Sequence, residues 1–343
     1  GGKVNYTYAA WNDMLETVIA QQKAGSAPDL FEVYDSNMYS VVLSGVAQPL
    51  TNYVSDADYS FYDVEKSLFS WKGEPYAIPL KPYVRLIMFN RDLFDLEGID
   101  APDVLFQNGE WNWETFRTVC KSMYKQQNGV TLQSSYGGWQ ESMLYFMYAN
   151  GSSMLKIDTE TGTVVPNLED EKAKSAINLL VEVRDTLNWN NALDYFDQGI
   201  EAMVCGKEFD ASILTLPFEV GVVPFPSGDD YEGRNVVVYP QGMAVPTGAK
   251  NPEGAVAFMR IVNELQKVLG DKREAARIGQ ANYDMIYADD VKFVYAYDKC
   301  LPDADRLIAT MTNYITDGVP AATSVANVLP DLVSQIEKMY GQQ

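Results

Sequence analysis

The sequence predicts an α/β protein of two lobes, and three observations lead to this prediction. Short apolar runs alternate along the whole chain with patterns that repeat about every 3.6 residues, which is typical of strands alternating with helices. The 343 residues exceed what one hydrophobic core usually sustains. No long stretch rich in proline, serine or glycine interrupts the pattern, so strands and not a flexible tether would join the lobes.

The amino-terminal segment predicts a strand, a helix and a second strand. Apolar side chains alternate over 4–8, recur at helical spacing over 11–19, and return in the run DLFEV at 29–33. Gly25 follows the helical pattern where a capping glycine belongs. This order predicts a βαβ unit with parallel strands and a right-handed crossover.

Later stretches predict helices with one buried face. Asn251 is a good N-cap for a helix over 251–269 and Pro252 suits its first turn, while Asn112 caps a helix in EWNWETF. A further helix is predicted over 171–187. The side chains expected on the buried faces are Trp113, Phe116, Val119 and Cys120; Ala173, Ala176, Ile177, Leu180 and Leu187; and Ala255, Phe258, Met259 and Val262.

Two strand-like stretches, 220–226 and 235–246, follow in the second half of the chain. Pro224 and Pro226 make 220–226 an edge or terminal strand, because proline cannot donate to a strand ladder. We expect the region of Met203 and Cys205 to be core.

The charge balance excludes some partners. Lys and Arg number 26 and Asp and Glu number 47, so the formal net charge is 26 minus 47, or −21. Such a chain repels a phosphate backbone and an anionic membrane surface. We therefore expect no nucleic-acid partner, and a membrane association only through a lipid anchor that this chain does not carry.

Cysteine and histidine usage removes several chemistries. The three cysteines are far apart and histidine is absent, which excludes the usual zinc and redox motifs and any nucleophile activated by histidine. Carboxylate, lysine or tyrosine chemistry stays open. We expect no metal site and no cofactor, and the cysteines do not decide the compartment.

The sequence shows neither a membrane span nor a signal peptide. No run reaches the roughly 18 apolar residues that a span needs. The opening GGKVNYTY has no charged region followed by an apolar one, so we expect any signal peptide to have been removed before this numbering begins.

Six stretches of the sequence form an ordered series: AGSAPDLFEVYDS (24–36), WKGEPY to NWETF (71–116), YFDQGIEAMVCG (195–206), VGVVPFPSG (220–228), YPQGMAVPTG to FMRIV (239–262) and YITDGVPAA to IEKM (314–339). The second stretch carries a Gly-x-x-Tyr-x-hydrophobic-Pro loop, an Asn-Arg-Asp-Leu strand end, Pro102, and Trp113 followed by Glu114. In this order the stretches resemble the extracellular solute-binding proteins of ATP-driven importers, of the sugar-binding type related to maltose-binding protein.

The resemblance implies a two-lobed clamshell of the periplasmic-binding-protein type II, each lobe a mainly parallel sheet flanked by helices, joined by crossover hinge strands. It places lobe 1 at 1–84 and 246–292 and lobe 2 at 85–245 and 293–343, with hinges near 83–87, 241–246 and 288–298. Members also carry a further strand and helix, roughly 35 to 45 residues, ahead of the strand matched here by VNYTYA, which this sequence apparently lacks.

The same resemblance explains how the segment 72–99 can be both core and boundary. The residues YAIPL at 76–80 would close the first lobe, KPYV at 81–84 would form a cleft loop, and RLIMFN at 85–90 would be the strand that enters the second lobe. Asn90 and Arg91 are then strand-end structure.

The function implied is that of the substrate-binding component of an ABC importer. It would bind a carbohydrate, such as an oligosaccharide, in the cleft between the lobes and close on it for delivery to permease subunits. The chain would not be an enzyme, and we expect a monomer located outside the cell as a surface lipoprotein or in the periplasm. The alternatives are a carboxylate-dependent glycosidase and a sensory or adhesive sugar-binding domain that takes no part in transport.

A sugar site needs aromatic rings and polar hydrogen-bonding groups. In lobe 1 the resemblance places Lys81 and Tyr83 in the cleft loop, and Asp35 and Asn37 after the strand at 29–33. The alternative for Asp35 and Asn37 is a turn that caps the next helix. Polyamine, peptide or glycerol-phosphate ligands occur on similar scaffolds, and Lys81 or Arg85 could meet an anion.

In lobe 2 the candidates lie at strand ends and helix starts. Trp139 follows two glycines, and Tyr239 and Gln241 lie where the returning strand passes the cleft. Trp189 and Tyr283 are further candidates. The alternatives are that Trp139 docks its loop onto the lobe and that Gln241 satisfies backbone groups at a strand edge.

Overall fold

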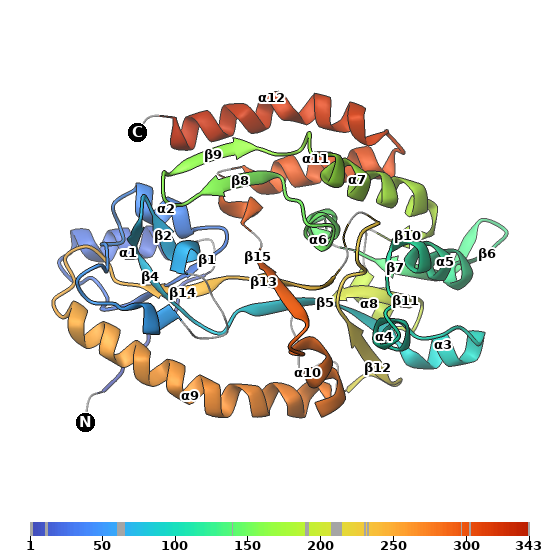
Figure 1. Cartoon of the computed structure of the whole chain (residues 1–343), viewed down its shortest axis with the longest axis horizontal. Coiled ribbons are helices and arrows are strands. Elements are labelled where there is room, and N and C mark those ends of the chain that lie inside the picture. Colours follow the sequence, from blue (N-terminus) through green and yellow to red (C-terminus); the bar gives the residue numbers. More distant parts are fainter. Residues whose placement is uncertain are drawn as a thin grey trace. The chain divides into compact units, whose positions relative to one another are not determined.

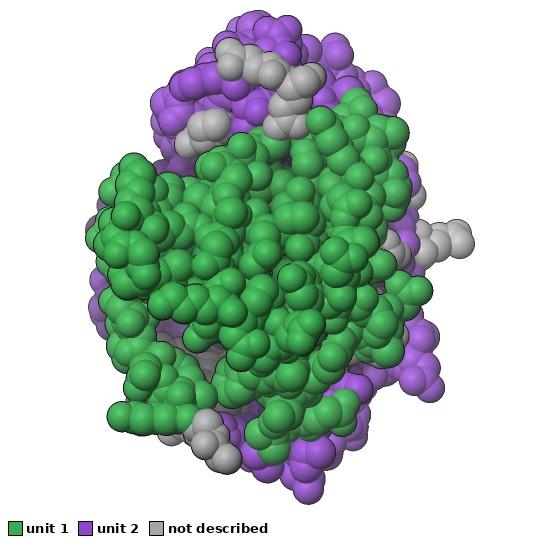
Figure 2. Space-filling view, turned by 90° about the vertical axis from the view of Figure 1, so that its left-hand side faces the viewer, with its two compact units in different colours: residues 1–82, 158–163, 240–266 green, residues 83–157, 164–239, 267–343 purple. Residues whose placement is uncertain are grey.

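The structure is a computed structural model of the whole chain, and it describes residues 3–10, 13–59, 66–138, 140–188, 192–206, 215–229, 231, 233–295, 297–301 and 303–341. The chain divides into two compact units, which Figure 2 colours separately. Unit 1 comprises 1–82, 158–163 and 240–266, and unit 2 comprises 83–157, 164–239 and 267–343.

Unit 1 is built on a three-stranded sheet in the order β1-β14-β4 (Figure 1). The central strand β14 (Gln241–Ala244) runs antiparallel to β1 (Phe31–Tyr34) and β4 (Ala77–Pro79). The carboxyl ends of β1 and β4 therefore lie where β14 begins; we call this the carboxyl edge of unit 1. Unit 1 also contains α1 (Met14–Lys23), α2 (Met38–Leu43), and the short ladder of β2 (Ser70–Trp71) with β3 (Glu74–Pro75).

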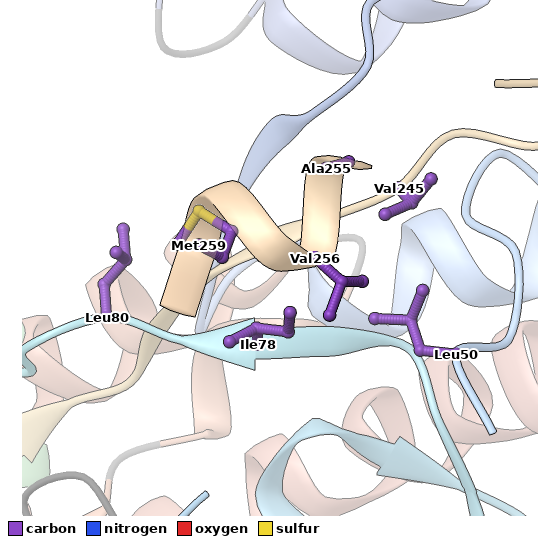
Figure 3. Close-up of a cluster of buried hydrophobic side chains, with 7 residues drawn as sticks. All are labelled: Leu50, Ile78, Leu80, Val245, Ala255, Val256 and Met259. Carbon is purple, nitrogen blue, oxygen red and sulfur yellow. The ribbon is translucent and has the colours of Figure 1, made fainter. Parts of the chain in front are cut away.

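The core of unit 1 lies between β4 and the first half of α9 (Pro252–Ile278). Figure 3 shows Val256 and Met259 on α9 near Ile78 on β4 and Leu50. Asn251 accepts a hydrogen bond from the Gly254 backbone at 3.0 Å, as its predicted role as N-cap requires. The predicted helical face is confirmed, since Ala255 and Met259 are buried and Phe258 and Val262 pack against the same cluster.

Unit 2 is built on a larger mixed sheet in the order β10-β7-β11-β5-β13-β15, with β12 also paired to β5 and β6 to β7. Strand β5 (Tyr83–Asn90) runs antiparallel to β11 (Glu201–Gly206) and β13 (Arg234–Tyr239). Strands β7 (Val130–Gly137), β10 (Leu187–Asn188) and β11 are parallel to one another, as are β13 and β15 (Val291–Tyr295). Their carboxyl ends therefore lie at the edge where β5 begins, the carboxyl edge of unit 2.

Helices surround this sheet, and α7, α11 and α12 pack together (Figure 1). The helices of unit 2 are α3 (Arg91–Glu97), α4 (Pro102–Gln107), α5 (Trp113–Met123), α6 (Ser142–Ala149), α7 (Glu171–Val183), α8 (Ala192–Asp197), α10 (Gln280–Ile286), α11 (Ala304–Thr316) and α12 (Ala321–Tyr340). The remaining strands are β6 (Lys125–Gln127), β8 (Leu155–Asp158), β9 (Thr163–Pro166) and β12 (Val220–Val223).

Several local predictions for unit 2 are confirmed. Asn112 and Thr115 form a capping box at the start of α5, and the predicted face of that helix is buried. Within the described part of the chain, strand β12 pairs only with β5, as expected of an edge strand. The Asn90 side chain accepts a hydrogen bond from the Leu93 backbone at 3.2 Å, and Arg91 contacts Asp103 at 2.6 Å, so both are strand-end structure.

Three details of the prediction are wrong. Residues 3–10 form no strand, since Tyr6 and Tyr8 are 75% and 91% exposed and a strand without a neighbour is unstable. Helix α7 ends at Val183, because a 3-10 turn follows and Leu187 then begins β10. The sheets are not mainly parallel: that of unit 1 is antiparallel and that of unit 2 is mixed, because β14 and β5 run against their neighbours.

The compact units differ in places from the predicted lobes. Segment 240–245 falls in unit 1, because β14 pairs with β1 and β4 there, and 267–292 falls in unit 2. Segment 158–163 also belongs to unit 1. The predicted hinges near 83–87, 241–246 and 288–298 stay a prediction.

Candidate functional site

The carboxyl edge of unit 2 carries a cluster of polar side chains, the Arg85 cluster, which consists of Arg85, Glu141, Tyr145, Tyr239 and Lys299. Arg85 lies on β5 and Tyr239 at the end of β13. Glu141 precedes α6, Tyr145 lies on that helix, and Lys299 lies in the short 3-10 helix η7 (Asp298–Cys300). Segments from residue 85 to residue 299 thus meet at one end of the sheet, where ligands bind in open α/β folds.

Strand register places the aromatic and cationic members on one face of the sheet. Tyr83 and Tyr239 are directly opposed in the antiparallel ladder, and Arg85 follows Tyr83 by two residues. Because side chains alternate along a strand, all three project from the same face. The Arg85 guanidinium accordingly lies over the Tyr239 ring, 4.4 Å from its centroid.

Glu141 is the centre of the hydrogen bonds in the cluster. Its Oε1 accepts from Lys299 Nζ at 2.5 Å, and its Oε2 accepts from the hydroxyls of Tyr145 at 2.8 Å and Tyr239 at 3.3 Å. Burial opposes the carboxylate charge, but the Lys299 ammonium and these hydrogen bonds outweigh it, so the pKa of Glu141 lies below its usual range. Glu141 is therefore an anion held by three donors.

Arg85 has a different environment. Among the described residues it makes no hydrogen bond or ion pair, and its Nε is buried without a partner. Burial opposes its charge, while Tyr145, Tyr239, Cys205 and Glu141 favour it, and the balance raises the pKa of the guanidinium. Arg85 is thus a partly buried cation whose donors are not used within the cluster.

The carboxyl edge of unit 1 brings together the candidates predicted there. The Gln241 amide donates to the Lys81 carbonyl at 2.5 Å, and the Lys81 backbone nitrogen donates to Gln266 at 3.2 Å. Asn37 accepts from the Tyr34 backbone at 2.8 Å, and Asp35 is 5% exposed. Gln241 thus satisfies a backbone carbonyl, as the alternative to a ligand contact stated for it, and Asn37 also contacts the backbone. A ligand contact of these side chains stays a prediction.

The aromatic candidates lie at different ends of the sheet of unit 2. Tyr83 is 38% exposed and Tyr239 only 6%, both at the carboxyl edge of unit 2. Tyr283 lies on α10 and packs against the ring of Tyr287, just past the end of that helix, with 4.5 Å between the ring centroids. The chain then leads to the amino end of β15, whereas Tyr239 lies beside the carboxyl end of that strand. Trp139 and Trp189 lie outside the described residues.

Sequence reasoning missed Glu141, Tyr145 and Lys299. Tyr145 belongs to an apolar helix in which every residue is buried, so it resembles core in the sequence. Glu141 and Lys299 are far apart in the chain, and no local spacing connects them. The one usable signal concerned Glu141, which lies between the end of β7 and the start of α6. Polar residues that follow a strand in this way often belong to binding sites.

A pocket of about 440 Å³ lies at a different place in unit 2. It is lined by Phe106, Trp111, Tyr231 and Arg234, among others. Arg234 begins β13, so this pocket lies at the amino end of the strand whose carboxyl end carries Tyr239. It contains none of the residues predicted for a site.

In the described residues, no group of three or more Cys, Asp or Glu side chains is placed to hold a metal ion. In the same part of the chain, no helix combines the length and apolar character needed to cross a bilayer.

The family model described as bacterial extracellular solute-binding protein matches residues 1–263. A putative binding protein of Brucella abortus strain 2308 is 21% identical over 336 residues, which cover 96% of this chain and 75% of that protein.

Solved structures share the fold at low identity. A cyclo/maltodextrin-binding protein complexed with maltotetraose superposes with a TM-score of 0.73 and 15% identity, covering 97% of this chain and 89% of its own. An ABC substrate-binding protein from Listeria monocytogenes, in complex with cycloalternan, superposes with a TM-score of 0.70 and 16% identity. The match covers 99% of this chain and 92% of that protein. The predicted two-lobed α/β fold class is thereby confirmed.

Proposed function

The chain belongs to the bacterial extracellular solute-binding protein family, and we propose that it is the substrate-binding component of an ABC importer that takes up a carbohydrate, such as an oligosaccharide. In this proposal the solute is bound at the carboxyl edges of the two units, which close on it for delivery to permease subunits. The structural neighbours described above are complexes with maltotetraose and with cycloalternan, which supports this class of ligand.

The observation that carries the proposal is the composition of the carboxyl edge of unit 2. Tyr83 supplies an exposed aromatic ring next to the hydrogen-bonding groups of the Arg85 cluster. Aromatic rings cover the apolar faces of sugars, and charged or amide groups bind their hydroxyls. The fold alone would not decide between ligands, so the ligand class rests on this edge.

The family is one of binding proteins, and the proposal includes no catalysis. The proposal also places the protein outside the cytoplasmic membrane, as the family description indicates, either as a surface lipoprotein or in the periplasm. Its partners would be the solute and the permease, and the protein itself would be a monomer.

Binding is tested by thermal unfolding in the presence of an oligosaccharide panel. A ligand that binds only the folded state adds about 2.7 kcal/mol at 100 times its dissociation constant, so the melting temperature should rise. Replacing Tyr83 by alanine should weaken binding at least about fivefold in isothermal titration, since an aromatic contact is worth about 1 kcal/mol.

The matched control is Tyr8→Ala, because Tyr8 is 91% exposed in the segment without strand structure. Its affinity should equal that of the unmodified protein. Incubation with chromogenic glycosides tests the enzyme alternative, and turnover of any of them would contradict a receptor function. Equal affinities in Tyr83→Ala and Tyr8→Ala would remove Tyr83 from the site.

A further inference from the structure

We propose that the carboxyl edge of unit 2 recognises an oxyanion on its solute, a carboxylate or phosphate group carried by a sugar, through the guanidinium of Arg85. This inference rests on the proposed function and narrows its ligand class to acidic carbohydrates. The anionic group would complete the hydrogen bonding of a cation that has no such partner in the described part of the chain.

The first argument is the set of partners around Arg85. The carboxylate that exerts an electrostatic effect on it, Glu141, already accepts hydrogen bonds on both oxygens. The Tyr145 and Tyr239 hydroxyls donate toward Glu141 and lie 2.7 Å from each other, and neither accepts a hydrogen bond from Arg85. Nothing else among the described residues supplies a hydrogen-bond acceptor to Arg85.

The second argument is the local charge. Arg85 and Lys299 carry two positive charges against one negative charge on Glu141, while Asp305, which also contacts Lys299 at 3.4 Å, is 83% exposed in its side chain. A cation that is partly removed from water without an acceptor is costly, and a neutral hydroxyl would accept a hydrogen bond but leave the charge uncompensated. A carboxylate or phosphate would both accept the hydrogen bonds of Arg85 and compensate its charge.

The third argument is geometric. The Tyr239 ring covers one face of the Arg85 guanidinium at 4.4 Å. Stacking of this kind fixes the plane of the guanidinium and leaves its edges, which carry the donors, for a coplanar group. Carboxylate and phosphate oxygens match these donors in pairs, and that match is the strongest form of arginine recognition.

The fourth argument is the contrast with the rest of the chain. The protein has a net charge of −21, so its overall field repels anionic solutes. The other half-buried arginines of unit 2 use their donors internally: Arg91 contacts Asp103 and Glu219, and Arg117 contacts Glu182 and Asp229. Arg85 differs from them in lying at the edge where the solute is proposed to bind.

The test uses matched pairs of probes measured by isothermal titration with the full chain. The pairs are α-1,4-galactobiose with α-1,4-digalacturonate, cellobiose with cellobiouronate, and glucose with glucose 1-phosphate. Glycerol 3-phosphate serves as an anion without a sugar ring. At least one anionic member should bind ten or more times tighter than its neutral counterpart, about the factor expected of a hydrogen bond to a charged group.

Two variants locate the effect. Arg85→Gln should lower affinity for the anionic sugar by roughly 10- to 150-fold and affinity for the neutral counterpart much less, because the glutamine amide can still donate to a hydroxyl. Arg85→Lys should recover part of the preference, since it keeps the charge but loses the planar fork. Arg117→Gln is the control, because it removes one positive charge from unit 2 away from this edge and should not change the preference.

The outcomes separate this inference from the proposed function. If neutral sugars bind as tightly as their acidic counterparts, or if Arg85→Gln weakens both equally, anion recognition is wrong and carbohydrate binding stands. If only glycerol 3-phosphate binds, anion recognition stands and the carbohydrate proposal is wrong. If no probe binds, both are overturned for these classes of solute.

Discussion

At the residue scale, the Arg85 cluster distributes its partners unevenly. Glu141 has three donors, whereas Arg85 has only the ring of Tyr239 within the described residues. A hydrogen bond to a charged group contributes about 1.5–3 kcal/mol, so an unsatisfied guanidinium leaves a comparable amount unused. This unused interaction is what a solute could supply on binding.

A second unusual residue, Glu201, lies fully buried at the start of β11. Its Oε2 accepts a hydrogen bond from the Asn188 amide at 3.1 Å, and its Oε1 has no partner among the described residues. Burial raises its pKa to about 7, and the hydrogen bond from Asn188 lowers it only in part. The folded protein therefore holds this carboxyl group protonated below neutral pH.

The raised pKa of Glu201 predicts a pH dependence of stability. The folded state binds more protons than the unfolded state between the ordinary glutamate pKa of 4.5 and about 7. The free energy of unfolding contributed by this group must therefore fall as pH rises through that window and level off above it. Glu201→Gln should remove this fall and stabilise the protein at pH 8, measured by urea unfolding at pH 5, 6, 7 and 8.

The control for Glu201 is Glu182→Gln, because the Glu182 side chain is 46% exposed in its pair with Arg117. Its pH profile should follow that of the unmodified protein, since surface pairs contribute little to stability. Identical slopes between pH 5 and 7 in Glu201→Gln and the unmodified protein would contradict the assignment. Burial also raises the pKa of Asp298, to about 6, so this residue makes the free energy of unfolding fall with rising pH in the same way. Asp298 is unchanged in both variants.

Prediction from sequence succeeded where the cause of a residue's role is local. Asn112 and Asn251 were assigned as helix caps because the groups they bind are three residues away, and both caps are present. Glu141 and Lys299 are 158 residues apart, so their pairing depends on the whole topology. Arg85 was noted as able to meet an anion, but its lack of an internal partner is a property of the folded state alone.

At the element scale, β5 and β14 determine where polar groups gather. Each runs antiparallel to its neighbours, so its amino end meets the carboxyl ends of the strands beside it. The apolar run in β5 was sufficient to predict a buried strand, but the loop predicted at 81–84 is too long, because β5 already begins at Tyr83. The direction of the strand within the sheet could not be read from that run, because apolar composition carries no direction.

The same limit explains the failed prediction at 3–10. Alternating Val4, Tyr6 and Tyr8 satisfy the pattern of a half-buried strand, yet all three are exposed. A strand needs a neighbour to satisfy its backbone groups, and a sequence pattern does not show whether one is present.

Helix α5 offers a test of a local element that carries tertiary packing. In its capping box, Asn112 accepts from the Thr115 backbone and Thr115 accepts from the Asn112 backbone, both at 3.1 Å. Asn112→Ala removes one half of this exchange and should cost about 1 kcal/mol of unfolding free energy. Urea unfolding at fixed pH measures the difference.

Thr118→Ala is the control for the capping box, because Thr118 lies on the exposed side of the same helix and its hydroxyl donates to the Glu114 carbonyl one turn earlier. It should change the free energy of unfolding by less than about 0.5 kcal/mol. A cost for Asn112→Ala no larger than that for Thr118→Ala would show that the capping box does not stabilise the helix.

At the scale of the whole molecule, both units are assembled from separated stretches of chain. Unit 1 is complete only when 240–266 returns to the sheet and core begun by 1–82. Helix α9 then continues without a break from Pro252 to Ile278, with its first part in unit 1 and its last part in unit 2 (Figure 1). Because helix formation is cooperative, this helix should couple the stability of the two units.

We therefore expect a single unfolding transition in calorimetry, and Met259→Ala tests it. Met259 is 1% exposed in the core of unit 1, and its truncation should cost about 2–5 kcal/mol and move the whole transition to lower temperature. Ile177→Ala, in the core of unit 2, should move the same transition. Two separate peaks, of which Met259→Ala shifts only one and Ile177→Ala only the other, would show that the units unfold independently despite the helix they share.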